Sequence, residues 1–370
     1  MRTNYLWGVL AATTAVSAPC PAQDPPAPPA APAPEVTVSE PEPLASEEQR
    51  RIRFFRARVL IENDGTEIIK PNHSTDRHYT AGQKLDFSWQ PEWAVRAANA
   101  LPFWDISNDT TTAAFGVSAA LLIFTPADID INPPDPDDRP YAGWLYAGLY
   151  FQRARDITPR VGTMGHYEVD LGVVGPSSLA EEAQKEVHRI LNDDLPQGWG
   201  HQLRDEFAIN VMYRRKLRLR LEEEGCDKLR WGLDFIAEGG GDVGTVYRQG
   251  VLGATFRFGQ NLPDDYGPAR IADVGAATGK RGCHRYAWYL FARVQGRAVE
   301  HNIFLDGNTW RDSRSVSKEP LVGELHVGGV LVLCRHLEIS YSQTFLTDEF
   351  KTQSSDDSFG ALTIAWTCSF

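Results

Sequence analysis

The chain has 370 residues, of which 42% are hydrophobic and 23% are charged. This ordinary balance excludes wholesale disorder and a collagen-like chain. The net charge of −12 argues against nucleic-acid binding, which requires a basic surface. Beyond the N-terminus no run of 18 apolar residues occurs, so a multi-span helical membrane protein is excluded. A membrane β-barrel stays open, because alternating strands give only weak hydropathy signals.

The first 50 residues are expected to lie outside the folded domain. Residues 1–22 have the features of a secretory signal peptide: Arg2, an apolar stretch too short to span a membrane, and small residues near Ala22. Residues 21–50 contain nine of the 24 prolines, so residues 23–50 are predicted to form an extended periplasmic tether. Residues 51–370 would then form the outer-membrane domain.

From residue 54 onward, apolar and polar residues alternate with a period of two, which is typical of β-strands. One side of each strand is apolar and often aromatic, whereas the other carries many full charges. This pattern suits lipid outside and a polar lumen inside, and an even number of strands suits a bacterial barrel. The sequence therefore predicts an all-β fold, a twelve-stranded antiparallel transmembrane β-barrel. Its strands are expected at 54–64, 79–89, 112–124, 142–154, 163–173, 206–221, 228–240, 245–258, 284–302, 319–334, 336–346 and 358–370.

The last strand alternates up to a terminal aromatic, Phe370. It resembles the terminal strand of bacterial outer-membrane barrels, which is read by the barrel insertion machinery. With the N-terminus in the periplasm, the connections that follow odd-numbered strands lie outside, and those at 222–227 and 259–283 are periplasmic turns.

One short helix is predicted in an extracellular loop, at about 178–192. Ser178 and Glu181 have the spacing of a capping box at its start. Gln184 and His188 lie one turn apart, beside an apolar stripe, so His188 can be buried against the barrel rim while a neighbour orients its other ring nitrogen. The stripe consists of Leu179, Ala183, Val187, Ile190 and Leu191.

Further polar motifs fall in the outer connections. Asn63-Asp64 ends the first strand, and the second strand begins within the block 76–82. By the period-two count, Asp64 and Thr80 both point toward the lumen at the tops of adjacent strands. The basic residues at 214, 216, 218 and 220 point the same way, so they are expected to pair with lumenal acids rather than form a binding site. The expected partners are Glu168, Asp170 and Asp234.

As an ordered set, these motifs resemble the outer-membrane lipid A 3-O-deacylase family, over residues 54–370. The residues that carry the resemblance are Asn63-Asp64, Asp76-Arg77-x-Tyr79-Thr80-x-Gly82, Asp138-Arg139-Pro140-Tyr141-Ala142-Gly143, Gly175-Pro176, Gln184-x-x-x-His188 and Gly198-Trp199-x-x-Gln202. The resemblance implies a twelve-stranded barrel with a loop helix, a calcium cofactor and hydrolysis of the 3-position ester of lipid A. Ala81 departs from the family, which usually has Asn there.

The resemblance also implies roles for individual residues. His188 would be the catalytic base that takes a proton from water, and Asn63 would donate to the oxyanion. Asp64 and Thr80 would hold calcium, which polarises the ester carbonyl. Arg139 would pair with a lipid phosphate, and it is assigned to the substrate site together with Tyr141 and Gln184.

Two alternatives stay open on the sequence alone. The chain could be an outer-membrane phospholipase that prefers glycerophospholipids, or a non-catalytic barrel that acts as a pore or a structural protein. The expected substrate is lipid A within lipopolysaccharide, the expected surroundings are outer-membrane lipids, and the active site is expected to face outside.

Four cysteines would remain after export, in a compartment where disulfides form. Cys226 and Cys283 both lie beside glycines at the periplasmic ends of strands, and they are predicted to pair. Cys334 and Cys368 fall on opposite faces of their strands, so a bond between them is not favoured.

Overall fold

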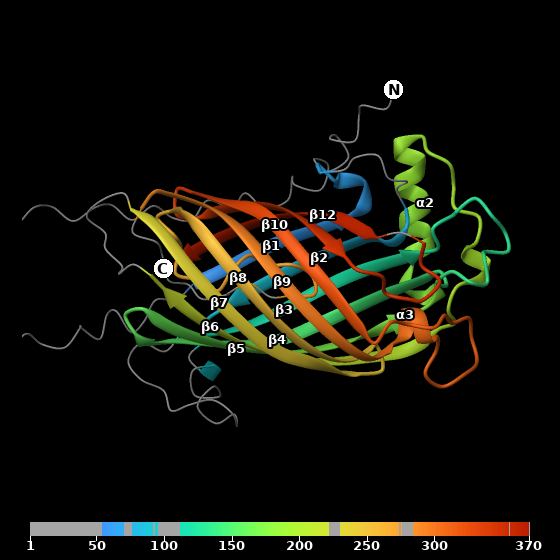
Figure 1. The fold of residues 1–370 in the computed structure, drawn as a ribbon, viewed down its shortest axis with the longest axis horizontal. Helices are drawn as coiled ribbons and strands as arrows, with labels where there is room; N and C mark the ends of the chain where they lie inside the picture. The colour runs from blue at the N-terminus through green and yellow to red at the C-terminus, as the bar shows by residue number, and fades with distance from the viewer. Residues whose placement is uncertain are drawn as a thin grey trace, which may run out of the picture.

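The computed structural model describes residues 54–69, 76–91, 93–94, 112–221, 230–273, 275, 284–354 and 356–369. The expected signal peptide and tether lie outside these residues. The described strands form one closed barrel in which each strand pairs with its neighbours in the chain, and β1 closes the barrel against β12 (Figure 1). Among the described residues, no helix has the length and apolar character needed to cross a bilayer.

The predicted twelve-stranded antiparallel barrel is confirmed, with strand ends shifted by a few residues. In addition to the strands, the described part of the chain contains three single 3-10 turns and two α-helices. The strands are β1 Phe54–Asn63, β2 His78–Trp89, β3 Thr112–Thr125, β4 Ala142–Thr158, β5 Val161–Val174, β6 Glu206–Arg220, β7 Trp231–Gly244, β8 Tyr247–Gln260, β9 Tyr286–Asn302, β10 Leu321–Leu333, β11 Leu337–Leu346 and β12 Asp357–Ser369. The turns and helices are η3 Asp64–Thr66, η4 Pro176–Ser178, α2 Ala180–Leu191, η5 Trp199–His201 and α3 Ile303–Asp306.

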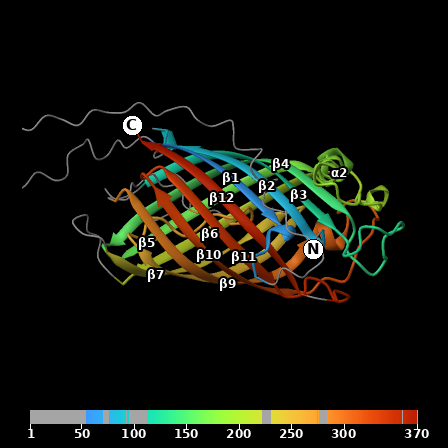
Figure 2. The same ribbon diagram turned by 90° about the horizontal axis from the view of Figure 1, so that it is seen from above.

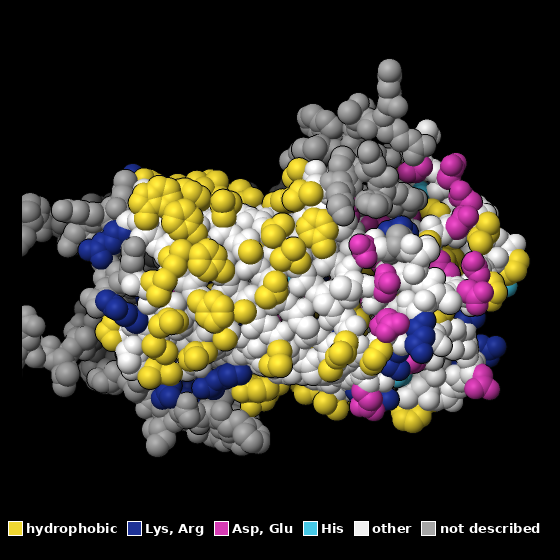
Figure 3. Space-filling view, viewed as in Figure 1, with side chains coloured by type: hydrophobic (Ala, Val, Ile, Leu, Met, Phe, Trp, Pro, Cys, Tyr) yellow, Lys and Arg dark blue, Asp and Glu magenta, His cyan; other side chains and the backbone are white. Residues whose placement is uncertain are grey.

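The two faces of the wall differ as the alternation predicts. Outward residues such as Leu149, Leu217 and Leu290 are exposed, whereas inward residues such as Arg58 and Glu168 are buried. Figure 3 shows apolar side chains spread over the strands and acidic side chains gathered at the end that carries α2. Such an apolar outer surface is stable in lipid and unfavourable in water, which fits a barrel that spans the outer membrane.

The basic run on β6 forms the expected lumenal ladder, but with different partners. Arg214 pairs with Asp242 at 2.9 Å, and Lys216 pairs with Asp273 at 3.0 Å. The predicted partners are engaged elsewhere: Glu168 binds Lys84 and Asp234 binds Arg257. The β6–β7 register sets Arg214 opposite Gly240, two residues from Asp242, and a one-strand pattern does not contain that register.

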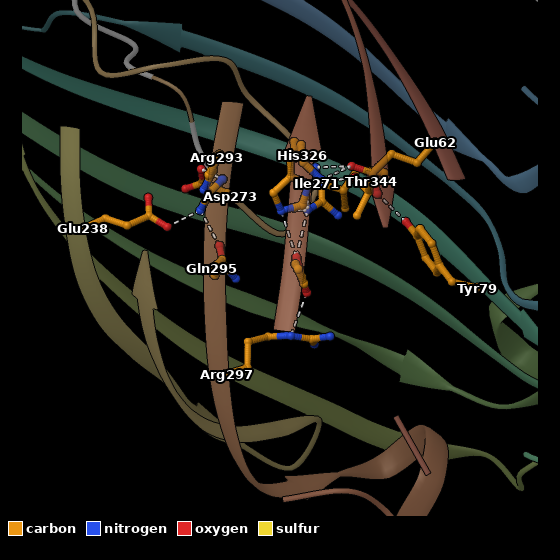
Figure 4. Close-up of polar contacts among 12 residues, drawn as sticks. Glu62, Tyr79, Glu238, Ile271, Asp273, Arg293, Gln295, Arg297, His326 and Thr344 are labelled. Carbon is orange, nitrogen blue, oxygen red and sulfur yellow. Dashed lines mark hydrogen bonds and ion pairs between the residues drawn. The ribbon is translucent and has the colours of Figure 1, made fainter. Parts of the chain in front are cut away.

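The β8–β9 connection is not the simple periplasmic turn that was expected. Its described residues fold back into the lumen, where Tyr266, Arg270, Ile271 and Asp273 are buried. The Ile271 N–H donates to Glu62 Oε1 on β1 at 3.0 Å, and Asp273 binds Arg293 on β9 (Figure 4). We call residues 262–273 the lumenal plug.

The outer end of the lumen is filled by α3. Phe304 is fully buried and stacks on Phe124 with ring centroids 4.0 Å apart. Helix α3 therefore fills the described interior at the outer end, and the lumenal plug fills it from the opposite end. The arrangement argues against an open pore.

Helix α2 begins differently from the prediction. Its N-cap is Leu179 in the left-handed region (φ 61°), with no side-chain cap, so the capping box of Ser178 and Glu181 is wrong. Ser178 belongs to η4 instead, and its side chain packs where Gly143 leaves no room for a Cβ atom. Its hydroxyl lies against Gly143 of β4 and accepts from the Ala180 N–H at 3.4 Å, so it contacts the start of the helix from η4 and not from the N-cap position.

The buried side of α2 is formed by Ala180, Gln184 and His188, so the expected burial of His188 against the barrel is confirmed. Of the apolar stripe, Ala183 packs on the cluster around Ile123, whereas Val187 and Ile190 are 50% and 72% exposed. The barrel presents polar groups at this place, and the helix turns its Gln184–His188 edge toward them.

Helix α2 packs on the outer surface of the barrel wall. Ala180 lies in a buried cluster with Ala81, Ile123, Tyr141 and Trp199. Ile123 alternates along β3 with Leu122 and Phe124, which belong to the lumenal cluster, so Ile123 points outward. The helix crosses the strands in Figure 1 and is seen close to end-on in Figure 2, so it lies transverse to the barrel axis.

The described cysteines behave differently from each other. Cys334 is a free, exposed thiol, and Cys368 is disulfide-bonded. The two therefore do not pair, as expected from their opposite faces. Cys226 and Cys283 lie outside the described residues. Since Cys334 is free, the disulfide at Cys368 argues against their predicted pairing in the exported chain.

Candidate active site on the outer wall

A bulge in β2 places the first part of the site. The β2–β3 register shifts between Tyr79 and Ala81, so one extra residue is accommodated there. The Tyr79 hydroxyl donates to Glu62 in the lumen at 2.8 Å, whereas the Thr80 hydroxyl lies 2.7 Å from that of Thr125. Thr125 follows the lumenal Phe124 on β3 and therefore faces outward, and Thr80 faces outward with it.

The expectation that Asp64 and Thr80 point toward the lumen is therefore wrong. A period-two count changes face at every residue, but at a bulge two successive residues oppose one partner and the count slips. Asp64 is no longer in a strand, because β1 ends at Asn63 and η3 begins at Asp64. Its contacts are with Arg77 and the region around Asp76, on the same outer side as Thr80.

Asn63 fixes the conformation of the turn that carries Asp64. Its Oδ1 accepts from the Gly65 N–H at 2.8 Å, and its Nδ2 donates to the Thr80 carbonyl at 3.0 Å. The amide thus ties the end of β1 to the bulge of β2. The predicted pair of Asn63 and Asp64 is brought directly beside Thr80.

Asp64 has one satisfied and one unsatisfied oxygen. Its Oδ2 accepts from the Arg77 N–H at 2.7 Å, whereas the buried Oδ1 has no hydrogen-bond partner among the described residues. Burial, together with the negative charge of Asp76, raises the pKa of Asp64 well above its usual value. A cation placed at Oδ1 would relieve both the desolvation and the repulsion.

His188 extends from the last turn of α2 and is almost fully buried. Its Nδ1 lies 2.5 Å from the Asp194 carbonyl, and its Nε2 lies 3.3 Å from Asp76 Oδ1. A carbonyl can only accept, so Nδ1 carries a proton, and Nε2 is the nitrogen that faces the site. The hydrogen bond with Asp76 raises the pKa of His188 above its usual value.

Gln184 holds the same carboxylate from one turn earlier. Its Nε2 donates to Asp76 Oδ1 at 3.1 Å, and its Oε1 accepts from Trp199 Nε1 at 2.8 Å. Trp199 in turn packs on Tyr141, with ring centroids 4.9 Å apart. Gln184 and Tyr141 are buried in this arrangement, so both position the site rather than present a surface to substrate.

Arg139 lies away from the other predicted site residues. Its guanidinium is fully buried, pairs with Glu349 at 3.1 Å and lies over the lumenal Phe124 ring. The expected contact with a lipid phosphate is not available to Arg139 in this structure. Its charge serves the outer end of the lumenal network instead.

Asp76 is the functional residue that the sequence reasoning missed. It begins the polar block 76–82, but it was given no role there. Its carboxylate receives Gln184 and His188, which are more than 100 residues away along the chain, and its own carbonyl accepts from Thr125 at 2.8 Å. No local pattern could reveal this convergence, because it depends on α2 crossing the outer wall.

The site has an oxygen-rich character. Among the described residues, no group of three or more His, Cys, Asp or Glu side chains is arranged to hold a metal ion. Calcium, however, also takes carbonyl, hydroxyl and water oxygens, so a smaller set of carboxylates suffices. The unpaired Oδ1 of Asp64, beside Asp76 and Thr80, fits such an ion.

Comparison with known proteins gives a family for this chain. The family model described as "Outer membrane protein LpxR" matches residues 10–368. The structure is similar to LpxR from Salmonella typhimurium, with a TM-score of 0.65 and 22% identity over 84% of this chain and 99% of that one. No curated protein matches the sequence.

Other solved barrels are more distant. The β domain of the Bordetella autotransporter Brka has a TM-score of 0.48 and 10% identity, over 86% of this chain and all of that one. The translocator domain of the autotransporter NalP from Neisseria meningitidis has a TM-score of 0.36 and 8% identity, over 85% of this chain and 88% of that one. The family match, by contrast, covers nearly the whole sequence. The chain therefore belongs to the outer membrane protein LpxR family, located in the outer membrane with a role of the lipid A deacylase kind.

Proposed function

We propose that the chain is a calcium-dependent lipid A 3-O-deacylase, which hydrolyses the ester-linked acyl group at the 3-position of lipid A in the outer leaflet. The observation that carries the proposal is the fixed imidazole of His188 on the outer wall, with Nε2 beside Asp76. A base on the lipid-facing side can meet an ester whose acyl chains stay in the bilayer. A site inside the filled lumen could not.

His188 acts as the general base in this proposal. The Asp194 carbonyl holds the proton on Nδ1, so Nε2 takes the proton from the attacking water. As the imidazole becomes positive, the Asp76 carboxylate at 3.3 Å stabilises it. Gln184 keeps that carboxylate oriented, so Asp76 and Gln184 are positioning residues.

Asn63 supplies a hydrogen-bond donor to the reacting ester in this proposal. One N–H of its Nδ2 donates to the Thr80 carbonyl, and the amide carries a second N–H. We assign that second N–H to the developing oxyanion, where a donor fixed in advance stabilises the transition state.

Asp64 and Thr80 would hold calcium. The support for this is the unpaired, buried Oδ1 of Asp64 and the repulsion between Asp64 and Asp76. When bound, calcium supplies a positive charge that polarises the ester carbonyl. Arg139, Tyr141 and Gln184 hold the surrounding structure in this proposal.

The decisive test compares lipid A with glycerophospholipid as the substrate. The purified protein is incubated with calcium and each lipid in turn, and the products are analysed by mass spectrometry. We expect loss of the 3-position acyl group from lipid A and no change in the phospholipid. Cleavage of the phospholipid alone would identify a phospholipase instead, and no cleavage of either lipid would indicate a non-catalytic barrel.

A further inference from the structure

We propose that two separate segments at the outer rim dock into the acyl region of the outer leaflet. The segments are α2 and residues 64–69, and together we call them the lipid collar. The proposal concerns how the protein is seated in the membrane, so it goes beyond the proposed hydrolysis and does not depend on it. The occupant of these surfaces is a lipid bilayer.

The first segment presents apolar side chains that nothing in the described barrel covers. Val187 and Ile190 are exposed on α2, and Leu179 is exposed at its N-cap. Glu182, Lys185 and Arg189 lie on another side of the same helix, so the helix is amphipathic around its exposed surface. Since the helix is transverse to the barrel axis, it runs parallel to the membrane plane (Figures 1 and 2). This is the orientation of interfacial amphipathic helices.

The second segment lies over different strands of the wall. The N–H groups of Ile68 and Ile69 donate to Gln343 Oε1 on β11, and the Tyr341 hydroxyl donates to the Thr66 carbonyl. Thr344, the residue after Gln343, binds the lumenal His326, so Gln343 points outward. The turn therefore lies on the lipid-facing side.

The side chains of this second segment are apolar as well. Ile68 is 69% exposed and Ile69 is also exposed, although their backbone is held against the wall. Two large β-branched side chains fixed in water would be unfavourable, whereas in lipid the same exposure is favourable.

The collar is continuous with the apolar surface of the barrel. Ala183 of α2 packs with Leu121, an outward residue of β3, in the cluster around Ile123. Leu145 and Leu149 continue the outward apolar row along the adjacent strand β4. Because the barrel wall is itself covered by lipid, this continuity favours lipid over any other occupant.

A protein partner fits the arrangement less well. The candidate site lies between the two collar segments. Asp64 belongs to residues 64–69, and His188 belongs to α2 and contacts Asp76. A rigid partner seated on both segments would lie across this site. A fluid lipid surface covers both segments and still admits single molecules between them.

Depth-dependent quenching tests the proposal. Cys334 is replaced by Ser to remove the free thiol, and an environment-sensitive fluorophore is attached at Ile190→Cys. The matched control carries the fluorophore at Arg189→Cys, the adjacent residue on the polar side. Both proteins are reconstituted into phosphatidylcholine vesicles that contain lipids spin-labelled in their acyl chains, and aqueous iodide is the opposing quencher.

We expect the spin-labelled lipid to quench position 190 several-fold more than position 189, and iodide to show the reverse order. Equal quenching of the two positions by iodide would overturn the proposal. Protection from both quenchers, increasing with the protein-to-lipid ratio, would also overturn it, because it would indicate a second copy of the chain as the occupant.

A charge placed in the collar gives an independent readout. In Ile190→Asp and Ile68→Asp, we expect several-fold lower hydrolysis of lipid A in vesicles and unchanged hydrolysis of lipid A in detergent micelles. Equal loss in both assays would contradict a docking role. The quenching result does not require activity, so failure of the collar and failure of the proposed hydrolysis can be distinguished.

Discussion

Replacement of Asp76 by Asn tests the link between the barrel wall and the imidazole. The side chain keeps its size and loses its charge, so Gln184 can still be held by the remaining oxygen. What is lost is a charged partner 3.3 Å from His188 Nε2. The tautomer is preserved, because Nδ1 is bound by the Asp194 carbonyl, which is part of the backbone.

The size of the effect follows from this geometry. A hydrogen bond to a charged group contributes about 1.5–3 kcal/mol, which corresponds to a loss of roughly 10- to 100-fold in kcat. Complete removal of a general base typically costs about 10²–10⁴-fold, so Asp76→Asn should fall short of His188→Ala. KM should change little, since Asp76 is assigned no contact with the substrate.

The assay measures release of the acyl group from lipid A in detergent with calcium, by mass spectrometry over time. Asp194→Asn is the matched control, because it removes a neighbouring carboxylate and keeps the carbonyl that binds Nδ1. The shift in electrophoretic mobility on heating verifies that each barrel is folded. Full activity of folded Asp76→Asn, or an equal loss in Asp194→Asn, would refute the positioning role of Asp76.

Three further outcomes are expected. His188→Ala should lower hydrolysis by about 10²–10⁴-fold in a folded, heat-modifiable barrel, and retention of more than a tenth of the activity would contradict its role as base. Hydrolysis should require a divalent cation and be lost in Asp64→Ala, whereas full activity in excess chelator, with no metal in the protein, would exclude the cation site. Arg270→Ala should leave Glu62 and Glu324 buried without this partner and cost about 3–5 kcal/mol. A lower temperature for loss of the heat-modifiable form would show this, and an unchanged temperature would contradict it.

The barrel could be predicted from the sequence because every second residue of a strand faces the same surroundings, either lipid or lumen. Alternation at positions such as 207–221 identifies both the strand and its lipid-facing side, without knowledge of its neighbours. The even number of strands and the terminal aromatic residue further indicated a bacterial outer-membrane barrel. None of these signals depends on which strand lies next to which.

The site could be predicted only in part, because its geometry depends on contacts between distant segments. His188, Asp64 and Thr80 were identified as an ordered set, and the structure brings them to one side of the wall. The predicted direction of Asp64 and Thr80, toward the lumen, was wrong. A bulge of one residue at Tyr79–Ala81 is not visible in a period-two count.

The surroundings of Arg139 depend on distant contacts in the same way. Arg139 has the residue type that binds phosphate, but the burial of its guanidinium against Glu349 depends on a loop more than 200 residues away.

The apolar stripe of α2 does not by itself show which way the helix faces. A helix usually turns its apolar face toward the protein core, but the surroundings of a helix beside a membrane can be apolar as well.

The lumenal plug also links the seam of the barrel to its interior. Its Arg270 and Ile271 bind Glu62 on β1, the strand that meets β12 where the cylinder closes. Because the plug belongs to the connection between β8 and β9, it can enter the lumen through the end of the barrel and needs no opening in the wall. Glu62 gains its ion pair with Arg270 only when the plug is in place. A barrel that closes without the plug therefore carries a buried carboxylate without this ion pair on its first strand, so the energy of the seam depends on the filling of the interior.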